Sequence, residues 1–213
     1  GVSMVYSVFL WRKGFRQDDR VNYFLMLAAA VLHTTAMIQR GFSLERCPVN
    51  NLYEASTFVA WTIVAAFLLL GLWPKLRFLG AFASPVLFGI GVFSLMPALD
   101  QGRVVEMNGT WSSLHAALIL LAYGAFGLSS VAALMYLSEE RDLKLHKLRA
   151  IMSRLPPIQR LESVMTRLSV VGFVLLTVGL TVGAYYLQAA TGSFFASDAK
   201  VIWSLLVWAL YLV

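Results

Sequence analysis

The sequence predicts an all-α fold, a polytopic integral membrane helix bundle of about six to seven transmembrane helices that forms a single domain over residues 1–213. Of the 213 residues, 59% are hydrophobic and 13% are charged, and the mean hydropathy is +0.73. A soluble domain is about half apolar and about a quarter charged. The apolar residues come in runs of about 20, the length that a helix needs to cross a bilayer. Because these runs are continuous and show no inside-outside alternation, they predict helices and exclude a transmembrane barrel.

The apolar segments follow one another along the chain. The first, Val2–Trp11, is shorter than a span and is expected to be the end of a first helix. The later segments are Asn22–Gln39, Leu52–Trp73, Phe78–Leu99, Trp111–Leu137, Leu168–Gln188 and Val201–Val213, of which the last is only the start of a span. Pro85 and Pro97 are expected to kink or end the helix that contains them, because proline has no amide hydrogen to donate. Since the sequence starts and stops inside apolar stretches, we expect it to be trimmed at one or both ends.

The basic residues predict the orientation in the membrane. Thirteen of the seventeen lysines and arginines lie in loops 12–20, 74–77 and 138–167, and four lie in the alternate loops. Cytoplasmic loops carry the excess of basic residues, so we expect those three loops in the cytoplasm of a cell with a bacterial-type inner membrane. The loops expected outside are 40–51, 100–110 and 189–200. The net charge of +6 is thereby explained without a nucleic-acid partner.

Segment 138–167 is the longest basic loop. It holds seven basic residues beside leucine, isoleucine and methionine side chains. We expect a cytoplasmic helical hairpin or surface helix whose cations contact anionic lipid headgroups. The alternative is a solvated linker.

Two of the three histidines lie inside predicted spans. His33 is seven residues before Arg40, about 10 Å below the outer surface, and His115 is four residues after Trp111, about 6 Å below it. An ionisable side chain within a span is unfavourable and points to a function. Two imidazoles at similar depth suit a haem iron, for which histidine is a standard axial ligand. The alternative is a histidine hydrogen-bonded between helices, and His146 in the basic segment is expected to be a solvated helix residue.

Polar and aromatic side chains gather at the same predicted outer side. Glu54 lies near the start of a span, with Trp61 two turns deeper. The carboxylate belongs either to a cofactor site or to the charges that the helix dipole favours near an N-terminus. The segment Phe194–Trp208 places aromatic residues on both sides of an acidic one, although interfacial tryptophans commonly only anchor a helix. Its candidate site residues are Asp198, Trp203 and Trp208.

The remaining motifs carry less information. Cys47 is the single cysteine, so neither an internal disulfide nor a CxxC pair is predicted. A thiolate haem ligand at Cys47-Pro48 is the less favoured interpretation, because a dipeptide is not a specific motif. The sequence contains no Gly-rich phosphate loop, nucleophile elbow or zinc-ligand spacing. Gly172, Gly179 and Gly183 have helical spacing and predict close packing of helices.

Several short motifs occur in a fixed order from about Asn22 to the end of the chain. They are His33; the run Cys47-Pro48-Val49-Asn50-Asn51-Leu52-Tyr53-Glu54 leading to Trp61; Leu114-His115 with Tyr123; Leu155-Pro156-Pro157 with Leu161-Glu162; and Asp198-Ala199-Lys200 with Trp203 and Trp208. In this order and spacing they resemble the cytochrome c assembly proteins of the CcsA/ResC and HemX type, to which CcmC and CcmF are more distantly related.

The resemblance implies a protein that handles haem b in the membrane. In this family a tryptophan-rich outer segment, the WWD motif, holds haem while flanking histidines ligate the iron, and members with the motif deliver haem to apocytochrome c or hold it in transit. The resemblance maps two family ligands onto His33 and His115. The further cofactor contacts expected here are Glu54, Trp61, Asp198, Trp203 and Trp208. The expected partners are membrane lipid, other membrane protein subunits and a component of an apocytochrome c pathway.

The sequence departs from the family in two respects. Phe194, Phe195 and Ser197 stand where the hallmark has tryptophans before Asp198, so the haem platform is degenerate. This favours the HemX-type branch, whose role is regulatory or accessory. Longer members also carry further helices with partner histidines, whereas this sequence stops at Val213, so a complete bis-histidine site cannot be drawn from its residues alone.

The leading prediction is therefore a haem-binding or haem-handling membrane protein that acts in cytochrome c assembly. No reaction need be catalysed by the chain, because positioning a cofactor is enough. The main alternative is an accessory or regulatory membrane subunit that does not bind haem. A small-solute transporter is less favoured, because neither an inverted repeat nor a pair of broken helices at corresponding positions is present.

Overall fold

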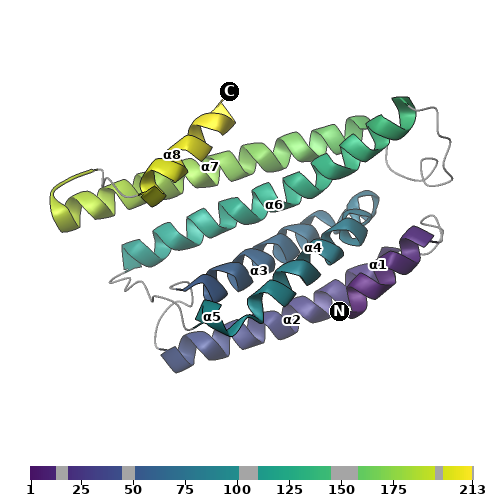
Figure 1. Ribbon diagram of the computed structural model, residues 1–213, viewed down its shortest axis with the longest axis horizontal. Coiled ribbons are helices and arrows are strands. Elements are labelled where there is room, and N and C mark those ends of the chain that lie inside the picture. Colours follow the sequence, from purple (N-terminus) through teal and green to yellow (C-terminus); the bar gives the residue numbers. More distant parts are fainter. Residues whose placement is uncertain (13–18, 45–50, 101–109, 145–157, 195–198, 213) are drawn as a thin grey trace.

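A computed structural model describes residues 1–12, 19–44, 51–100, 110–144, 158–194 and 199–212, and within these ranges every regular element is a helix (Figure 1). In chain order the elements are α1 (Val2–Arg12), α2 (Asp19–Leu44), α3 (Leu52–Leu70), the 3-10 turn η1 (Pro74–Leu76), α4 (Leu79–Ser94), α5 (Pro97–Asp100), α6 (Thr110–Lys144), α7 (Ile158–Thr191) and α8 (Ala199–Leu212). The predicted all-α helix bundle is confirmed.

Four of these helices, α2, α3, α6 and α7, are long and apolar enough to cross a membrane, and α4 and α8 are shorter apolar helices. The chain is thus a multi-pass membrane protein, and its outward faces carry large apolar side chains such as Leu32 and Phe42. In water such a continuous apolar surface would be unfavourable, whereas lipid tails solvate it. These outward apolar faces are therefore suited to contact with membrane lipid.

One predicted span was wrong. The segment Phe78–Leu99 is not one helix, because α4 ends at Ser94 and the separate short helix α5 begins at Pro97. The expected break at Pro97 is confirmed, while α4 continues through Pro85. The basic segment 138–167 is described only at its two ends, which prolong α6 to Lys144 and begin α7 at Ile158; the expected helical hairpin or surface helix lies for the most part outside the described residues. At 35 residues α6 is about 52 Å long, longer than the roughly 30 Å hydrocarbon core.

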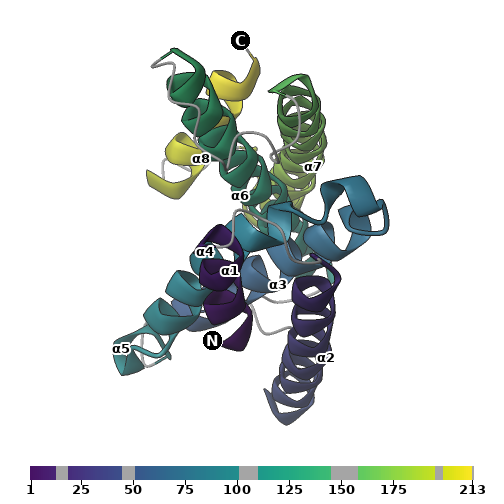
Figure 2. The ribbon, with the colours of Figure 1, turned by 90° about the vertical axis from the view of Figure 1, so that its right-hand side faces the viewer.

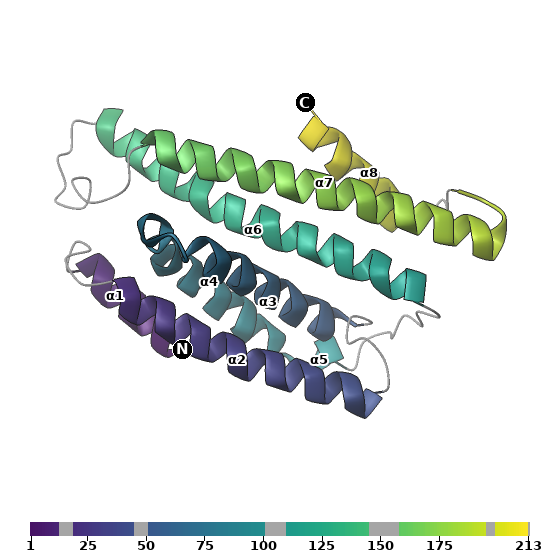
Figure 3. The same cartoon turned by 180° about the vertical axis from the view of Figure 1, so that it is seen from behind.

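The helices alternate in direction, so two sets of helix termini lie at opposite ends of the bundle (Figures 1 and 3). At one end α2 and α5 finish and α3 and α6 begin; we call this the Arg40 end. At the other, which we call the Arg77 end, α1 finishes, α3 turns into α4, and α6 gives way to α7. This alternation agrees with the strict alternation of basic-rich and basic-poor loops in the sequence.

The bundle consists of two groups of helices. In the end view of Figure 2, α1 to α5 lie on one side and α6, α7 and α8 on the other, with α3 and α6 in contact between them. Buried apolar side chains join the groups: Phe67 of α3, Leu79 of α4, Leu128 and Met135 of α6, and Leu161 of α7.

Glycines allow α6 and α7 to approach closely. A Cβ atom at Gly172 would lie 2.7 Å from the Phe126 ring, and one at Gly179 would lie 2.9 Å from the side chain of Ile119. A side chain at either position would displace these neighbours, so glycine permits the close approach of the two helices. The packing role predicted from the spacing of these glycines is confirmed.

The tight basic turn predicted at 74–77 is also present. Arg77 Nε donates a hydrogen bond of 2.8 Å to the carbonyl of Gly71, and its guanidinium lies 5.1 Å from the centroid of the Tyr23 ring. The Tyr23 hydroxyl in turn donates to the Leu68 carbonyl at 3.0 Å. The Arg77 side chain thus provides a hydrogen-bond donor for a backbone carbonyl at the C-terminal end of α3. Its cation–π contact with Tyr23 links this end to α2.

Two histidine sites and the residues that hold them

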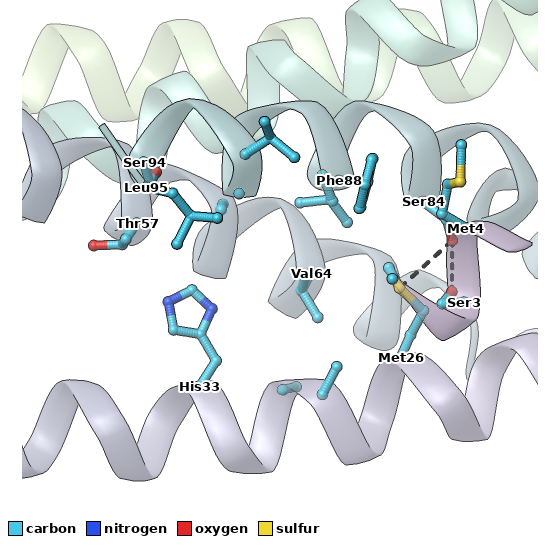
Figure 4. A pocket seen from close by; sticks show the side chains of 17 residues that line it. Ser3, Met4, Met26, His33, Thr57, Val64, Ser84, Phe88, Ser94 and Leu95 are labelled. Carbon is cyan, nitrogen blue, oxygen red and sulfur yellow. Dashed lines mark hydrogen bonds between the residues drawn. The ribbon is translucent and has the colours of Figure 1, made fainter. Parts of the chain in front are cut away.

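His33 lines a partly open cavity of about 370 Å³ between α1, α2, α3 and α4. Figure 4 shows its imidazole rising from α2 into this space, toward Thr57 of α3 and Leu95, which directly follows α4. The walls are mainly apolar, and the thioethers of Met4 and Met26 line them as well. The histidine therefore faces a mainly apolar space that is partly open to the outside of the bundle.

The end of the cavity away from His33 is polar. The Ser3 hydroxyl donates to Asn22 Oδ1 at 2.6 Å and lies 2.7 Å from the hydroxyl of Ser84. Ser84 in turn lies 3.6 Å from Met26 Sδ (Figure 4). Asn22 is buried, and its Nδ2 is the buried side-chain atom for which no hydrogen-bond partner is found among the described residues. The hydroxyl groups thus link α1, α2 and α4 behind the cavity.

The His33 ring has no hydrogen bond to any described residue, although it lies within a span. A half-buried imidazole without a protein partner is unfavourable in an apolar setting. The alternative predicted from the sequence, a histidine hydrogen-bonded between helices, is not what the structure shows for His33. Its ring nitrogens are available to a ligand in the cavity.

A charged cluster closes the Arg40 end of the same helices. Arg40 Nε donates to Glu54 Oε1 at 3.0 Å, and its Nη2 donates to Asp100 Oδ1 at 2.5 Å. The Glu54 side chain has none of its surface exposed, whereas 31% of Arg40 is exposed. Because a buried carboxylate needs a partner, Arg40 explains how Glu54 is accommodated.

Asn51 and Tyr53 complete this cluster. Asn51 caps α3, since its Oδ1 accepts from the Glu54 amide at 2.7 Å, and its Nδ2 donates to Asp100 Oδ1 at 3.0 Å. The Arg40 guanidinium lies 4.9 Å from the centroid of the Tyr53 ring. The cluster therefore fastens α2, α3 and α5 together. Glu54, a candidate cofactor contact, has its charge balanced by Arg40.

Trp61 holds α3 against α2 beside His33. Its indole Nε1 donates to Thr34 Oγ1 at 2.8 Å, and its ring packs on Phe58 with centroids 5.9 Å apart. Thr34 follows His33 directly in α2. Trp61 thus positions the stretch of helix that carries the histidine.

His115 has a different setting, on the face of α6 that packs against α7. Its Nδ1 lies 2.7 Å from the carbonyl oxygen of Gly179. A Cβ atom at Gly183 would lie 2.5 Å from the same nitrogen. The ring therefore rests directly on the backbone of α7.

Trp208 fastens α8 to this pair of helices. Its Nε1 donates to Thr177 Oγ1 at 2.9 Å, and its ring stacks on Phe173 with centroids 5.8 Å apart. Trp203, one and a half turns earlier in α8, is 65% exposed. Asp198 and the dipeptide Cys47-Pro48 lie outside the described residues.

Comparisons with known proteins identify the family of this chain. Residues 49–213 match the family described as cytochrome C assembly protein. The chain belongs to the cytochrome c assembly protein family. It is 28% identical over 214 residues to the cytochrome c biogenesis protein CcsA of Synechococcus sp. (strain CC9605), which covers 88% of this chain and 70% of the relative. It is 26% identical over 200 residues to protein HemX of Brevibacillus brevis, with 92% and 73% covered.

In this member of the cytochrome c assembly family, the predicted site residues fall into two groups. His33, Glu54 and Trp61 belong to the α2–α3 side, and His115 and Trp208 belong to the α6–α7–α8 side. His33 faces a cavity formed by α1 to α4, while His115 is bonded to α7. The structure therefore does not bring the two histidines together.

Sequence reasoning missed most of the residues that support these groups. Arg40 and Asp100 are 60 residues apart and bond to each other, and Ser3 and Ser84 are 81 apart. The available signal was the presence of polar side chains at span ends and inside spans, which is costly unless they are paired. That signal identifies such residues but not their partners.

Proposed function

We propose that this protein binds haem b in a bacterial-type inner membrane and holds it at the outer face for cytochrome c assembly, together with other membrane subunits or an apocytochrome c pathway component. Membership of the cytochrome c assembly family supports a role in that process. The relative named CcsA is a cytochrome c biogenesis protein. The observation that carries the cofactor proposal is the unbonded His33 imidazole pointing into an apolar cavity.

The residues around His33 fit haem by their chemistry. An imidazole nitrogen is a standard axial ligand of haem iron, and a thioether is another; His33, Met4 and Met26 line one cavity. Its volume of about 370 Å³ falls in the range of about 300–1,000 Å³ that is typical of ligand pockets. When bound, haem supplies the iron and the porphyrin that a c-type cytochrome needs. The chain itself would bind and orient that group and exclude water from it.

We assign His33 and His115 to separate haem sites. Each belongs to its own group of helices, and His115 Nδ1 is engaged with α7. The His115 site would then need a further iron ligand from elsewhere, whereas the His33 cavity already contains the thioethers of Met4 and Met26. By the positive-inside rule, the Arg40 end faces outward and the Arg77 end, with the basic ends of α6 and α7, faces the cytoplasm.

A second candidate function is an accessory or regulatory subunit that does not bind haem. Two observations favour it. Phe194 stands where the family hallmark has a tryptophan, and Trp208 is engaged in packing α8 onto Thr177 of α7. The similarity to a protein named HemX is in keeping with that branch.

The Soret absorption of protein purified from haem-replete cells tests both candidates. We expect a band from the unmodified protein, a weaker band from His33→Ala, and an unchanged band from the control His146→Ala, which removes the histidine that is not a candidate ligand. Size-exclusion profiles would show that each variant is folded. No band from the unmodified protein would refute the haem proposal in favour of the accessory subunit, and a band that His33→Ala leaves unchanged would refute the assignment of His33.

A further inference from the structure

We propose that Gly179 and Gly183 of α7 form a socket that positions His115, holding its Nδ1–H and leaving Nε2 as the ligand nitrogen. The inference concerns the orientation and the tautomer of the ring, and it rests on the proposed function only where it names haem iron as the ligand of Nε2.

The hydrogen bond to Gly179 sets the tautomer. A carbonyl oxygen can only accept, so the nitrogen that lies 2.7 Å from it, Nδ1, must carry the proton. A neutral imidazole has one N–H, so Nε2 then keeps its lone pair. Metal-bound histidines commonly donate their other ring N–H to a backbone carbonyl or carboxylate, which fixes the ring and makes the ligand nitrogen more basic.

The missing side chain at Gly183 makes the space for this ring. An added Cβ would lie 2.5 Å from Nδ1 and 2.6 Å from Cε1 of His115. No side chain can be present there without displacing the ring, because non-bonded heavy atoms do not approach so closely. Gly183 is thus a positioning residue that acts through His115.

The socket is built from rigid elements. Gly179 and Gly183 are one turn apart on a helix of 34 residues, and the Trp208–Thr177 hydrogen bond fastens α8 to α7 two residues before Gly179. A Cβ at Gly179 would meet Ile119, one turn after His115 on α6, at 2.9 Å. The backbones on both sides of the imidazole are therefore held close, as a precise ligand position requires.

Nitrogen-15 NMR of the histidine ring in detergent-solubilised, haem-free protein tests the socket without reference to haem. His33→Gln and His146→Gln in one background, purified without a histidine tag, leave His115 as the only imidazole. At alkaline pH we expect a single Nδ1–H tautomer, with Nε2 unprotonated. An Nε2–H tautomer, or averaging between the two, would overturn the proposal.

Gly183→Ala in the same background should abolish the single Nδ1–H state, whereas Gly91→Ala on α4, where an added Cβ meets no atom within 4 Å, should preserve it. If Gly183→Ala kept the parent spectrum, Gly183 would not be a positioning residue. If Gly183→Ala fails to fold, the spectrum of the parent background still decides which tautomer His115 adopts. A single Nδ1–H tautomer in a protein that shows no Soret band would refute the haem proposal and leave the socket intact.

Discussion

The two histidines differ in what surrounds them. His33 has open space beside it and no hydrogen bond to a described residue, whereas His115 is bonded to the backbone of α7 in a contact that only glycine permits. The helices around His33 are fastened by polar groups at their ends and behind the cavity, and those around His115 are fastened by close packing along their length. The imidazole of His33 therefore borders open space, whereas that of His115 is held in place by the backbone of α7.

The largest expected effect concerns the charged cluster at the Arg40 end. Glu54→Ala removes the buried carboxylate that accepts from Arg40, and we expect it to lower the free energy of unfolding by about 2–3 kcal/mol, since hydrogen bonds to charged groups contribute about 1.5–3 kcal/mol. Chemical unfolding in detergent, followed by circular dichroism, measures the loss.

Glu140→Ala is the matched control, because Glu140 pairs with the exposed Lys144 one turn away and such surface pairs contribute little. Equal losses for the two variants would show that the ends of α2 and α3 are not held by this cluster.

The same substitution placed in each region tests the difference in packing directly. Ala122→Leu on α6 adds volume where Ala122, Phe126 and Leu176 are already buried together, and overpacking costs about 1–3 kcal/mol. Ala30→Leu on α2 adds the same volume beside the cavity, and we expect its unfolding free energy to change by no more than about 0.5 kcal/mol. If Ala30→Leu were as destabilising as Ala122→Leu, the cavity would not be open to a ligand.

Filling the cavity should also affect haem. Ala30 is one turn before His33 on the same face of α2, so Ala30→Leu is expected to lower the haem-to-protein ratio while the fold persists. The pyridine haemochrome assay gives this ratio. An unchanged ratio would place the haem elsewhere.

The smallest expected effect compares two glycines. Gly172→Ala places a Cβ 2.7 Å from the buried Phe126 ring and should destabilise the protein by about 1 kcal/mol after the helix-propensity gain of alanine is included. Gly89→Ala on α4 meets no atom within 4 Å and should stabilise it by about 0.5–1 kcal/mol. Opposite signs in thermal unfolding would confirm that α7 packs closely at Gly172 and that α4 has free space at Gly89.

The fold could be predicted well from the sequence because a membrane span is recognised from the composition of a single continuous segment. The membrane helices, the break at Pro97 and the packing glycines of α7 all follow from residues near one another in the chain. The helix ends beyond the bilayer were less predictable, since α6 continues past Leu137 through a polar stretch of good helix formers to Lys144.

The candidate sites were predictable only in part. His33 and His115 could be selected as ionisable residues within spans, but their different settings depend on contacts between distant residues. His115 meets Gly179 across 64 residues, and Arg40 meets Glu54 across 14. A single sequence carries no record of such pairs. A histidine hydrogen-bonded between helices was one of the predicted alternatives and is found at His115, but its partner Gly179 and the charged cluster around Arg40 were not anticipated.

The most direct test of the account is the haem content of four proteins: the parent, His33→Gly, His115→Gly and the double variant, each purified from haem-replete cells. Separate sites predict that each single variant keeps part of the Soret band, that the double variant loses it, and that added imidazole, which fits the space left by the histidine, restores part of it. Complete loss in either single variant would mean that the two histidines share one iron, and a band that survives in the double variant would mean that neither histidine is a ligand.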